Sequence, residues 1–253
     1  LFSQSGDLGS TWTEPFSLSQ FEGNCIDDDF TPEGAVPAIG RQGEIFVSWG
    51  FDEKIYFDRS FDNGNTWLDE DIVVVEQQAG WAMEIPGLDR CNGMPVTGID
   101  NSNGKYSGSL YIVYADQNKR GTDTDIFLVR SLDQGNTWSE PIHVFEDDRN
   151  RHQFLPWMSV DEKTGNIFIV FYDRSAYNDL RTDVMLAVSE DGGQTFSRYT
   201  ISESPFLPPG PSKFFGDYNN IDAYNGKVRP IWTSYSNNKL SIWTALIDWK
   251  SKL

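Results

Sequence analysis

Short apolar runs alternate with polar turns along the whole chain, and the clearest runs come in pairs. Runs of four to eight residues that are rich in β-branched and aromatic side chains are typical of β-strands. Helical periodicity is absent, so the pattern predicts an all-β protein. Three pairs carry the signal: EIFVSWG and KIYFDRS (44–50 and 54–60), SLYIVYAD and DIFLVRS (109–116 and 125–131), and NIFIVFYD and DVMLAVS (166–173 and 183–189).

Each pair is the centre of a larger unit. A shorter run precedes it (VPAIG, PVTGID or PWMSVD) and another follows it (DIVVVEQ, EPIHVFE or SRYTIS), so each unit predicts four antiparallel strands. Residues 219–247 repeat the first three strands, whereas the N-terminal residues supply only the end of a third strand and an outer strand. Repeated four-stranded units predict one β-propeller domain over residues 1–253, with about five blades visible.

One eight-residue turn recurs between the third and fourth strands: SGDLGSTW (5–12), SFDNGNTW (60–67), SLDQGNTW (131–138) and SEDGGQTF (189–196). We call these segments the Asp turns. An Asp can accept backbone N–H groups within a turn, and a Gly can adopt a positive φ. The final aromatic residue has a large face to pack between sheets. Catalysis needs one asymmetric site, so we expect a structural role for the four aspartates, Asp7, Asp62, Asp133 and Asp191.

The pattern Ser-x-Asp-x-Gly-x-Thr-Trp resembles the Asp box, or bacterial neuraminidase repeat, of the sialidase-like β-propellers. The four copies extend the resemblance over almost the whole chain, which is similar to secreted bacterial proteins of sialidase-like or glycosyl-hydrolase-like type. The resemblance implies a carbohydrate partner and a secreted or cell-surface location. It also favours a six-bladed parent, of which this sequence is a part. The alternative is a compact ring in which residues 1–20 complete the last blade.

The composition of the chain limits the classes of partner that it can bind. The chain has 38 acidic and 20 basic residues and a net charge of −18, which argues against binding nucleic acid through a basic surface. No apolar run approaches the ~18 residues of a membrane span, and the chain opens on LFSQSGDLGS, so we expect that any export signal has been removed. Cys25 and Cys91 are the only cysteines, and they form one disulfide or remain two free thiols.

The loops divide into two sets on opposite faces of the predicted propeller. The connections from first to second strand are short and share their face with the Asp turns. The other connections are long, and long loops on a rigid scaffold are where binding sites concentrate. They comprise residues 21–35, 77–94, 146–155 and 203–218 between blades, and 116–125 and 173–183 within them.

The long loops contain aromatic, acidic and basic residues that suit a glycan, because carboxylates bind hydroxyls and Arg binds an acidic sugar through two N–H groups. We predict binding roles for Glu33, Trp81, Arg90, Arg151, Gln153 and Arg174, and catalytic roles for His152, Asp217 and Tyr218.

The resemblance to sialidases refines these roles, since that family uses an arginine triad, a Tyr nucleophile with a Glu, and an Asp acid. Arg90, Arg151 and Arg174 would form the triad, and Tyr218 beside Asp217 the nucleophile with its carboxylate. The sequence departs from that family in one respect, because it lacks the family's Phe/Tyr-Arg-Ile-Pro motif.

Simpler roles exist for the same residues. His152 and Gln153 would cap the entry to a strand, and Asp217 and Tyr218 would bind the backbone between blades. Arg174, like Arg59 and Arg130, would tie one blade to the next.

The oxygen donors of two loops suggest a calcium site, because hard cations prefer oxygen ligands. The oxygen donors are Asp116, Asp123 and Asp125 in one loop, and Asp173, Asn178, Asp179 and Asp183 in the other. Neither loop has the spacing of a defined calcium motif, so ordinary turn roles are the alternative and no cofactor is required. The sequence leaves the oligomeric state open.

These observations predict a secreted propeller that binds carbohydrate on its long-loop face, with glycoside hydrolysis as an activity to test. The alternative is a non-catalytic module of a larger surface protein that binds a glycan or a protein. An enzyme would show two carboxyls, or a Tyr and a carboxylate, together in the central opening with an Arg nearby.

Overall fold

The computed structural model describes residues 1–26, 28–118, 123–146 and 149–250. These residues form sixteen strands in four antiparallel sheets, which confirms the all-β prediction. The first sheet contains β1 (Glu33–Ile39), β2 (Ile45–Phe51), β3 (Lys54–Ser60) and β4 (Ile72–Glu76); the second contains β5 (Val96–Ile99), β6 (Leu110–Gln117), β7 (Thr124–Ser131) and β8 (Ile142–His143); the third contains β9 (Gln153–Val160), β10 (Ile167–Asp173), β11 (Asp183–Ser189) and β12 (Ser197–Thr200); the fourth contains β13 (Asn220–Tyr224), β14 (Lys227–Ser236), β15 (Lys239–Thr244) and β16 (Ile247–Asp248).

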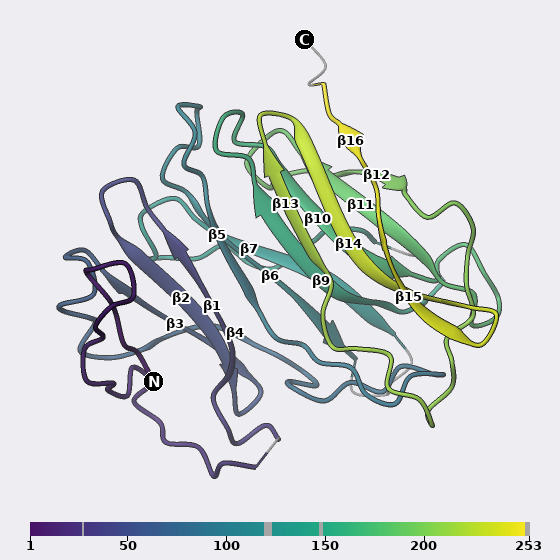
Figure 1. Cartoon of the computed structure of the whole chain (residues 1–253), viewed down its shortest axis with the longest axis horizontal. Helices are drawn as coiled ribbons and strands as arrows, with labels where there is room; N and C mark the ends of the chain where they lie inside the picture. Colours follow the sequence, from purple (N-terminus) through teal and green to yellow (C-terminus); the bar gives the residue numbers. More distant parts are fainter. Residues whose placement is uncertain (27, 119–122, 147–148, 251–253) are drawn as a thin grey trace.

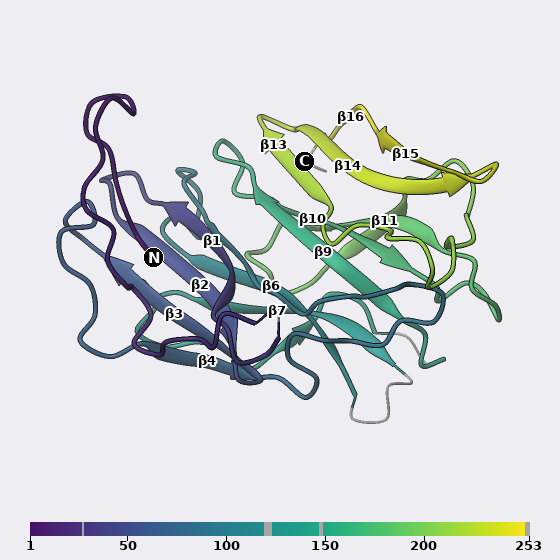
Figure 2. The ribbon, with the colours of Figure 1, turned by 60° about the horizontal axis from the view of Figure 1, so that its bottom comes forward.

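The sheets are arranged as the blades of a propeller (Figure 1). The first strands of successive sheets, β1, β5, β9 and β13, contact one another in turn around the centre, and the later strands extend outward. In both views the sheet of β1–β4 and the sheet of β13–β16 lie at opposite ends of the array (Figure 2). No helix in the described ranges is long and apolar enough to cross a membrane.

Burial explains why the third sheet has the longest continuous apolar runs. Every residue of β10 and β11 is buried, whereas every residue of β12 is exposed. A strand covered on both faces by neighbouring sheets tolerates few polar side chains. This explains why IFIVFYD and DVMLAV are almost entirely apolar in the sequence. Phe168, Phe171 and Tyr172 belong to the largest apolar cluster of the molecule.

The fourth sheet has no outer strand among the described residues, as the sequence predicts. Its last element, β16, pairs with Lys227 and Val228 of β14, while β15 pairs with β14 from Ile231 onward. The other edge of β14 is occupied by β13. Therefore β15 and β16 follow one another along the same edge and act as one interrupted third strand.

The N-terminal segment packs on the first sheet rather than the last. Phe2 forms an isolated bridge with Phe16, and its ring lies 4.9 Å from that of Trp67. Gln20 and Asp71 exchange two hydrogen bonds, of 2.9 and 3.0 Å. Residues 1–20 therefore lie against the first sheet, and they do not complete the sheet of β13–β16 as the compact ring would require.

Each Asp turn has the local geometry that its residue types favour. The Asp133 carboxylate accepts hydrogen bonds from the Ser131 hydroxyl (2.7 Å), the Thr137 amide (2.9 Å) and the Thr137 hydroxyl (2.7 Å). Gly135 has φ of 85°. Trp138 packs edge-on against Phe57 of the preceding sheet at 5.1 Å, so the turn connects two blades.

Candidate functional site in the central depression

Strand register places the Asp turns and the starts of the inner strands on opposite faces. Ile45 pairs with Ile39, the last residue of β1, and with Ser60, the first residue of an Asp turn. Glu33, the first residue of β1, pairs with Gly50 at the other end of the sheet. The second and third sheets repeat this order. The predicted division into two faces is therefore confirmed.

On the face opposite the Asp turns, the long loops surround two adjoining cavities of about 180 and 40 Å³ that share four lining residues. We call this space the central depression. All four sheets contribute to it, through the start of β1, the segment before β5, the start of β9 and the segment before β13. The shared residues are Asn92, Met94, Asp217 and Tyr218.

A bidentate ion pair crosses the depression between two of these loops. Arg90 donates from Nε to Asp217 Oδ1 (2.8 Å) and from Nη2 to Asp217 Oδ2 (2.5 Å). The side chain of Arg90 is 45% exposed and that of Asp217 is 16% exposed. Asn92 Nδ2 donates to the backbone oxygen of Asp217 (3.0 Å), and the Arg90 guanidinium lies 5.1 Å from the ring centre of Phe214. These contacts fix the loops 77–94 and 203–218 to one another.

A second polar contact holds Glu33 at the edge of the depression. Trp81 Nε1 donates to Glu33 Oε2 at 2.9 Å, and the Trp81 amide donates to Asp29 Oδ1 at 3.0 Å. The Asp29 backbone oxygen accepts from the amide of Asp52 at the β2–β3 turn (2.7 Å). The indole is thus oriented from both ends, and a carboxylate oxygen is kept at the cavity wall.

Aromatic and thioether groups line the rest of the depression. Tyr218 is 57% exposed, and its ring meets that of Trp157 edge-on at 6.1 Å. The Tyr218 hydroxyl lies 3.8 Å from Met94 Sδ. An exposed aromatic face beside anchored carboxylates is a surface with both apolar and polar character, as small-molecule sites usually are.

Five of the residues predicted from sequence line the depression: Glu33, Trp81, Arg90, Asp217 and Tyr218.

The structure does not bring the three arginines of the expected triad together. Arg174 is 2% exposed and donates to Thr182 Oγ1 (3.0 Å) and to the Pro86 carbonyl (2.8 Å). Burial lowers the pKa of Arg174 to about 10. Arg151 donates to Asn178 Oδ1 (3.2 Å) and does not line the depression.

His152 and Gln153 lie beneath the loops rather than in the depression. His152 Nδ1 is 3.0 Å from the Thr124 hydroxyl, and that hydroxyl accepts from Gln117 Nε2 (2.9 Å). Burial first, and then the charges of Arg174 and Arg151, lower the pKa of His152 to about 4. Gln153 is fully buried. His152 thus contacts Thr124 at the start of β7, Gln153 is enclosed by its neighbours, and neither residue lines the depression.

Sequence reasoning missed Met94 and Trp157 as lining residues. Trp157 lies in β9, in a run that reads as an ordinary inner strand, and Met94 lies in the segment before β5. The sequence signal for Met94 is its position just before an inner strand, where the chain opens on the long-loop face. Trp157 is the fifth residue of β9 and has no such signal.

The acidic residues considered for calcium are occupied by local contacts. Among the described residues, no group of three or more metal-binding side chains is close enough to hold an ion. Asp116 accepts from the amides of Gln78 (2.9 Å) and Ala79 (3.1 Å). Asp183 accepts from the Tyr177 and Ser202 hydroxyls. In the same two loops, Asp173 accepts a hydrogen bond from Ser175, and Asp179 accepts one from Arg181. Asp123 directly follows residues 119–122, which lie outside the described ranges, and Asp125 lies in β7 opposite Asp116.

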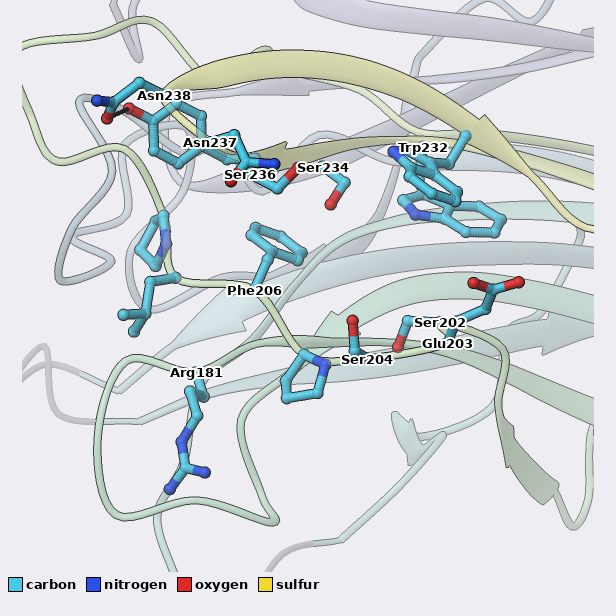
Figure 3. A pocket seen from close by; sticks show the side chains of 15 residues that line it. Arg181, Ser202, Glu203, Ser204, Phe206, Trp232, Ser234, Ser236, Asn237 and Asn238 are labelled. Carbon is cyan, nitrogen blue, oxygen red and sulfur yellow. Dashed lines mark hydrogen bonds between the residues drawn. The ribbon is translucent and has the colours of Figure 1, made fainter.

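A larger cavity of about 700 Å³ lies between the third and fourth sheets, away from the inner strands (Figure 3). Phe206 and Trp232 face it from opposite walls. Beside this cavity a two-residue turn, Asn237 and Asn238, joins β14 to β15, whereas residues 174–182 form the corresponding loop of the third sheet. None of the residues predicted for binding or catalysis lines it, so the central depression is the candidate site.

The two cysteines are both free but differ in their exposure to solvent. Cys25 is exposed and Cys91 is buried, and they are not bonded to each other. Burial raises the pKa of the Cys91 thiol to about 12. Of the two alternatives that the sequence leaves open, the structure therefore has two free thiols.

No protein-family model and no curated protein matches the chain. Solved structures do match. A Hadza microbial sialidase superposes with a TM-score of 0.55 at 15% identity, over 85% of this chain and 44% of that one. An α-L-arabinofuranosidase from Fusarium graminearum, solved with an iminosugar inhibitor, superposes with a TM-score of 0.55 at 13% identity. The match covers 90% of this chain and 66% of the arabinofuranosidase. An α-L-arabinanase from Penicillium chrysogenum, solved with arabinobiose, superposes with a TM-score of 0.50 at 14% identity. The match covers 95% of this chain and 68% of the arabinanase.

At these identities the likeness establishes the fold, which is a sialidase-like β-propeller. The chain spans less than half the length of the sialidase and about two thirds of the arabinofuranosidase. These structural neighbours are carbohydrate-active propeller enzymes, and the central depression is the place where this chain would be tested for a related function.

Proposed function

We propose that this chain binds a carbohydrate in the central depression. The observation that carries the proposal is the meeting of Glu33, Arg90 and the adjacent pair Asp217 and Tyr218 at one cavity, from three segments far apart in sequence. Carboxylates and a guanidinium can bind sugar hydroxyls, and an exposed ring can pack on the apolar face of a sugar. The structural neighbours include enzymes solved with arabinobiose and with an iminosugar, which supports a ligand of this class.

Two tyrosines at opposite ends of β13 give the test a matched control. Tyr218 lies just before the strand and is 57% exposed, whereas Tyr224 ends it and is 50% exposed. Tyr218 lines the central depression, and Tyr224 lines a cavity on the face of the Asp turns. We expect Tyr218→Ala to weaken glycan binding at least tenfold and Tyr224→Ala to leave it within twofold. Binding would be measured by calorimetry after a glycan array identifies a ligand.

Equal losses in both variants would argue against the central depression as the site. An absence of binding to every glycan on the array would argue against carbohydrate recognition, and would favour the alternative of a protein-binding module.

Hydrolysis of a glycosidic bond is a second candidate, favoured by the presence of Glu33, Asp217 and Tyr218 at one cavity. Glycosidases use a pair of carboxyls, or a Tyr with a carboxylate. Both carboxylate oxygens of Asp217 accept from Arg90, whereas the Trp81 contact engages only Oε2 of Glu33, so Glu33 is the better candidate for proton transfer. Glu33→Gln should then abolish release of reducing sugar while preserving binding. An unchanged rate would exclude Glu33 from the chemistry.

The expected location outside the cell belongs to the same proposal. It is supported by the net charge of −18 and by the resemblance of the Asp turns to a secreted repeat. Detection of the protein in culture medium or at the cell surface of its source would test it.

A further inference from the structure

We infer that the central depression selects an uncharged sugar over one that carries a carboxylate, and that the pairing of Arg90 with Asp217 determines this selectivity. The inference rests on the proposed function, because it names the class of carbohydrate that the same site takes.

The charges at the cavity wall point to this class. Among the described residues that line the depression, three side chains are charged: Glu33, Arg90 and Asp217. Two negative charges and one positive charge give a net charge of −1 (−2 + 1). The whole chain carries −18. A sugar carboxylate would therefore approach a site of its own sign, and like charges at close range disfavour a complex.

The guanidinium that could reverse this effect is already bound to a carboxylate. A bidentate Arg–carboxylate pair is the geometry with which proteins recognise acidic ligands. Asp217 takes that place, with contacts of 2.8 and 2.5 Å to Arg90. Asn92 holds the Asp217 backbone (3.0 Å), and the Asp217 side chain is only 16% exposed. An acidic sugar would have to displace an internal carboxylate that is fixed in position.

No second cation in the described lining compensates for this pairing. Arg174 is 2% exposed and donates to the Pro86 carbonyl below the surface. Arg151 donates to Asn178 in the loop 173–183. Neither side chain lines the depression.

A neutral sugar meets a more favourable surface. The carboxylate oxygens of Glu33 and Asp217 retain acceptor capacity beyond the bonds they already make, since each oxygen has two lone pairs. Sugar hydroxyls are donors, so they match these acceptors. Tyr218 and Trp157 add ring surface to the same depression.

The test measures dissociation constants for oligosaccharides that differ in charge. The neutral panel contains arabino-, xylo-, manno- and galacto-oligosaccharides, together with lactose and methyl-esterified oligogalacturonate. The acidic panel contains free oligogalacturonate of the same length and sialyllactose. We expect the wild-type protein to bind at least one neutral ligand, and to bind each acidic ligand at least tenfold more weakly than its neutral counterpart.

Asp217→Asn tests the cause of the preference. It removes the carboxylate that neutralises Arg90, so we expect acidic ligands to gain at least tenfold in affinity relative to their neutral counterparts. Asp179→Asn is the matched control, because Asp179 receives two 3.0 Å contacts from Arg181 Nε away from the depression. The control should leave the selectivity unchanged.

The outcomes separate the inference from the proposed function. Tight binding of an acidic ligand by the wild-type protein would overturn the inference and leave carbohydrate binding intact, and this result needs no variant to fold. An equal change of selectivity in both variants would overturn the role of the pair. If neither panel binds, the proposed function fails and the inference fails with it.

Discussion

The guanidinium of Arg130 donates a 2.8 Å hydrogen bond to the carbonyl oxygen of Gly192, which lies in the Asp turn of the next sheet. Arg59 makes the equivalent contact one sheet earlier, with the backbone of Gln134 and with Asn136 Oδ1 (2.7 Å). In the first two sheets, an arginine near the end of the third strand thus binds the Asp turn of the next sheet. The Asp turns therefore stabilise the packing between blades as well as the hairpin they close.

The first prediction concerns the carboxylate of an Asp turn. Asp133→Ala removes an acceptor of three hydrogen bonds from Ser131 and Thr137, so the turn should lose its local order. Because water reaches this turn, we expect the free energy of unfolding to fall by only about 1 kcal/mol. Urea denaturation measures it, with Glu162→Ala in another exposed turn as the control. A loss in the control as large as in Asp133→Ala would refute this account.

The second prediction separates the two roles of an Asp turn by comparing equivalent glycines. Gly9 and Gly135 both have φ of 85°. A Cβ on Gly135 would overlap the ring of Phe57, whereas a Cβ on Gly9 has no described atom within 4 Å. Gly9→Ala should cost about 1 kcal/mol from backbone strain alone. Gly135→Ala should cost about 1 to 3 kcal/mol more, because Phe57 must move.

Chemical denaturation of both glycine variants gives the comparison directly. Equal losses would show that the turns act only locally and that the contact between blades adds nothing to stability.

The third prediction is that the stability of the folded protein decreases as the pH falls. Hydrogen bonds, first from the Thr66 and Thr137 amides, lower the pKa of Asp62 and Asp133 to about 2, below the ordinary value of 3.8. A lowered pKa means that these groups contribute stability above pH 3.8 and that this stability is lost as the pH falls toward 2. The melting temperature should therefore fall over this range, and fall less steeply in Asp133→Ala. Parallel curves for the two proteins would contradict the prediction.

The fourth prediction concerns His152. Its pKa of about 4 makes the imidazole neutral at pH 7, and the folded state then resists protonation between the ordinary value of 6.5 and 4. In this window the unfolded chain takes up the proton first, so His152 makes the protein less stable as the pH falls. The chain has two histidines, so NMR titration with a His152→Gln variant can assign the signal. A midpoint near 6.5 would show that His152 is exposed to solvent.

The fifth prediction concerns the thiols. Cys25 is exposed, whereas Cys91 is buried with a pKa of about 12. Since the thiolate is the reactive form, a thiol reagent at neutral pH should modify Cys25 in the native protein, and Cys91 only after unfolding. Mass spectrometry of the labelled protein gives the count. Two modified thiols without denaturant, or none with it, would disagree with the structure.

Much of the fold could be predicted from contiguous letters. The paired strands of each unit follow from apolar runs of fixed length, and the Asp turns follow from the chemistry of Asp and Gly at set positions. The two faces follow as well, because antiparallel order alone places Ser60 near Ile45 and far from Glu33. Residue type and strand order are local properties, so the sequence by itself determined the blades and the face on which to look.

Only the tertiary structure decided which charged side chains meet. Arg90 and Asp217 are 127 residues apart and form a bidentate pair, whereas Arg174, from an equally promising loop, is buried beneath the site. The sequence places all of these residues on the same face but cannot rank them. Their partners depend on how separate sheets pack around a common centre, and that packing sets the distances on which ion pairs and hydrogen bonds depend.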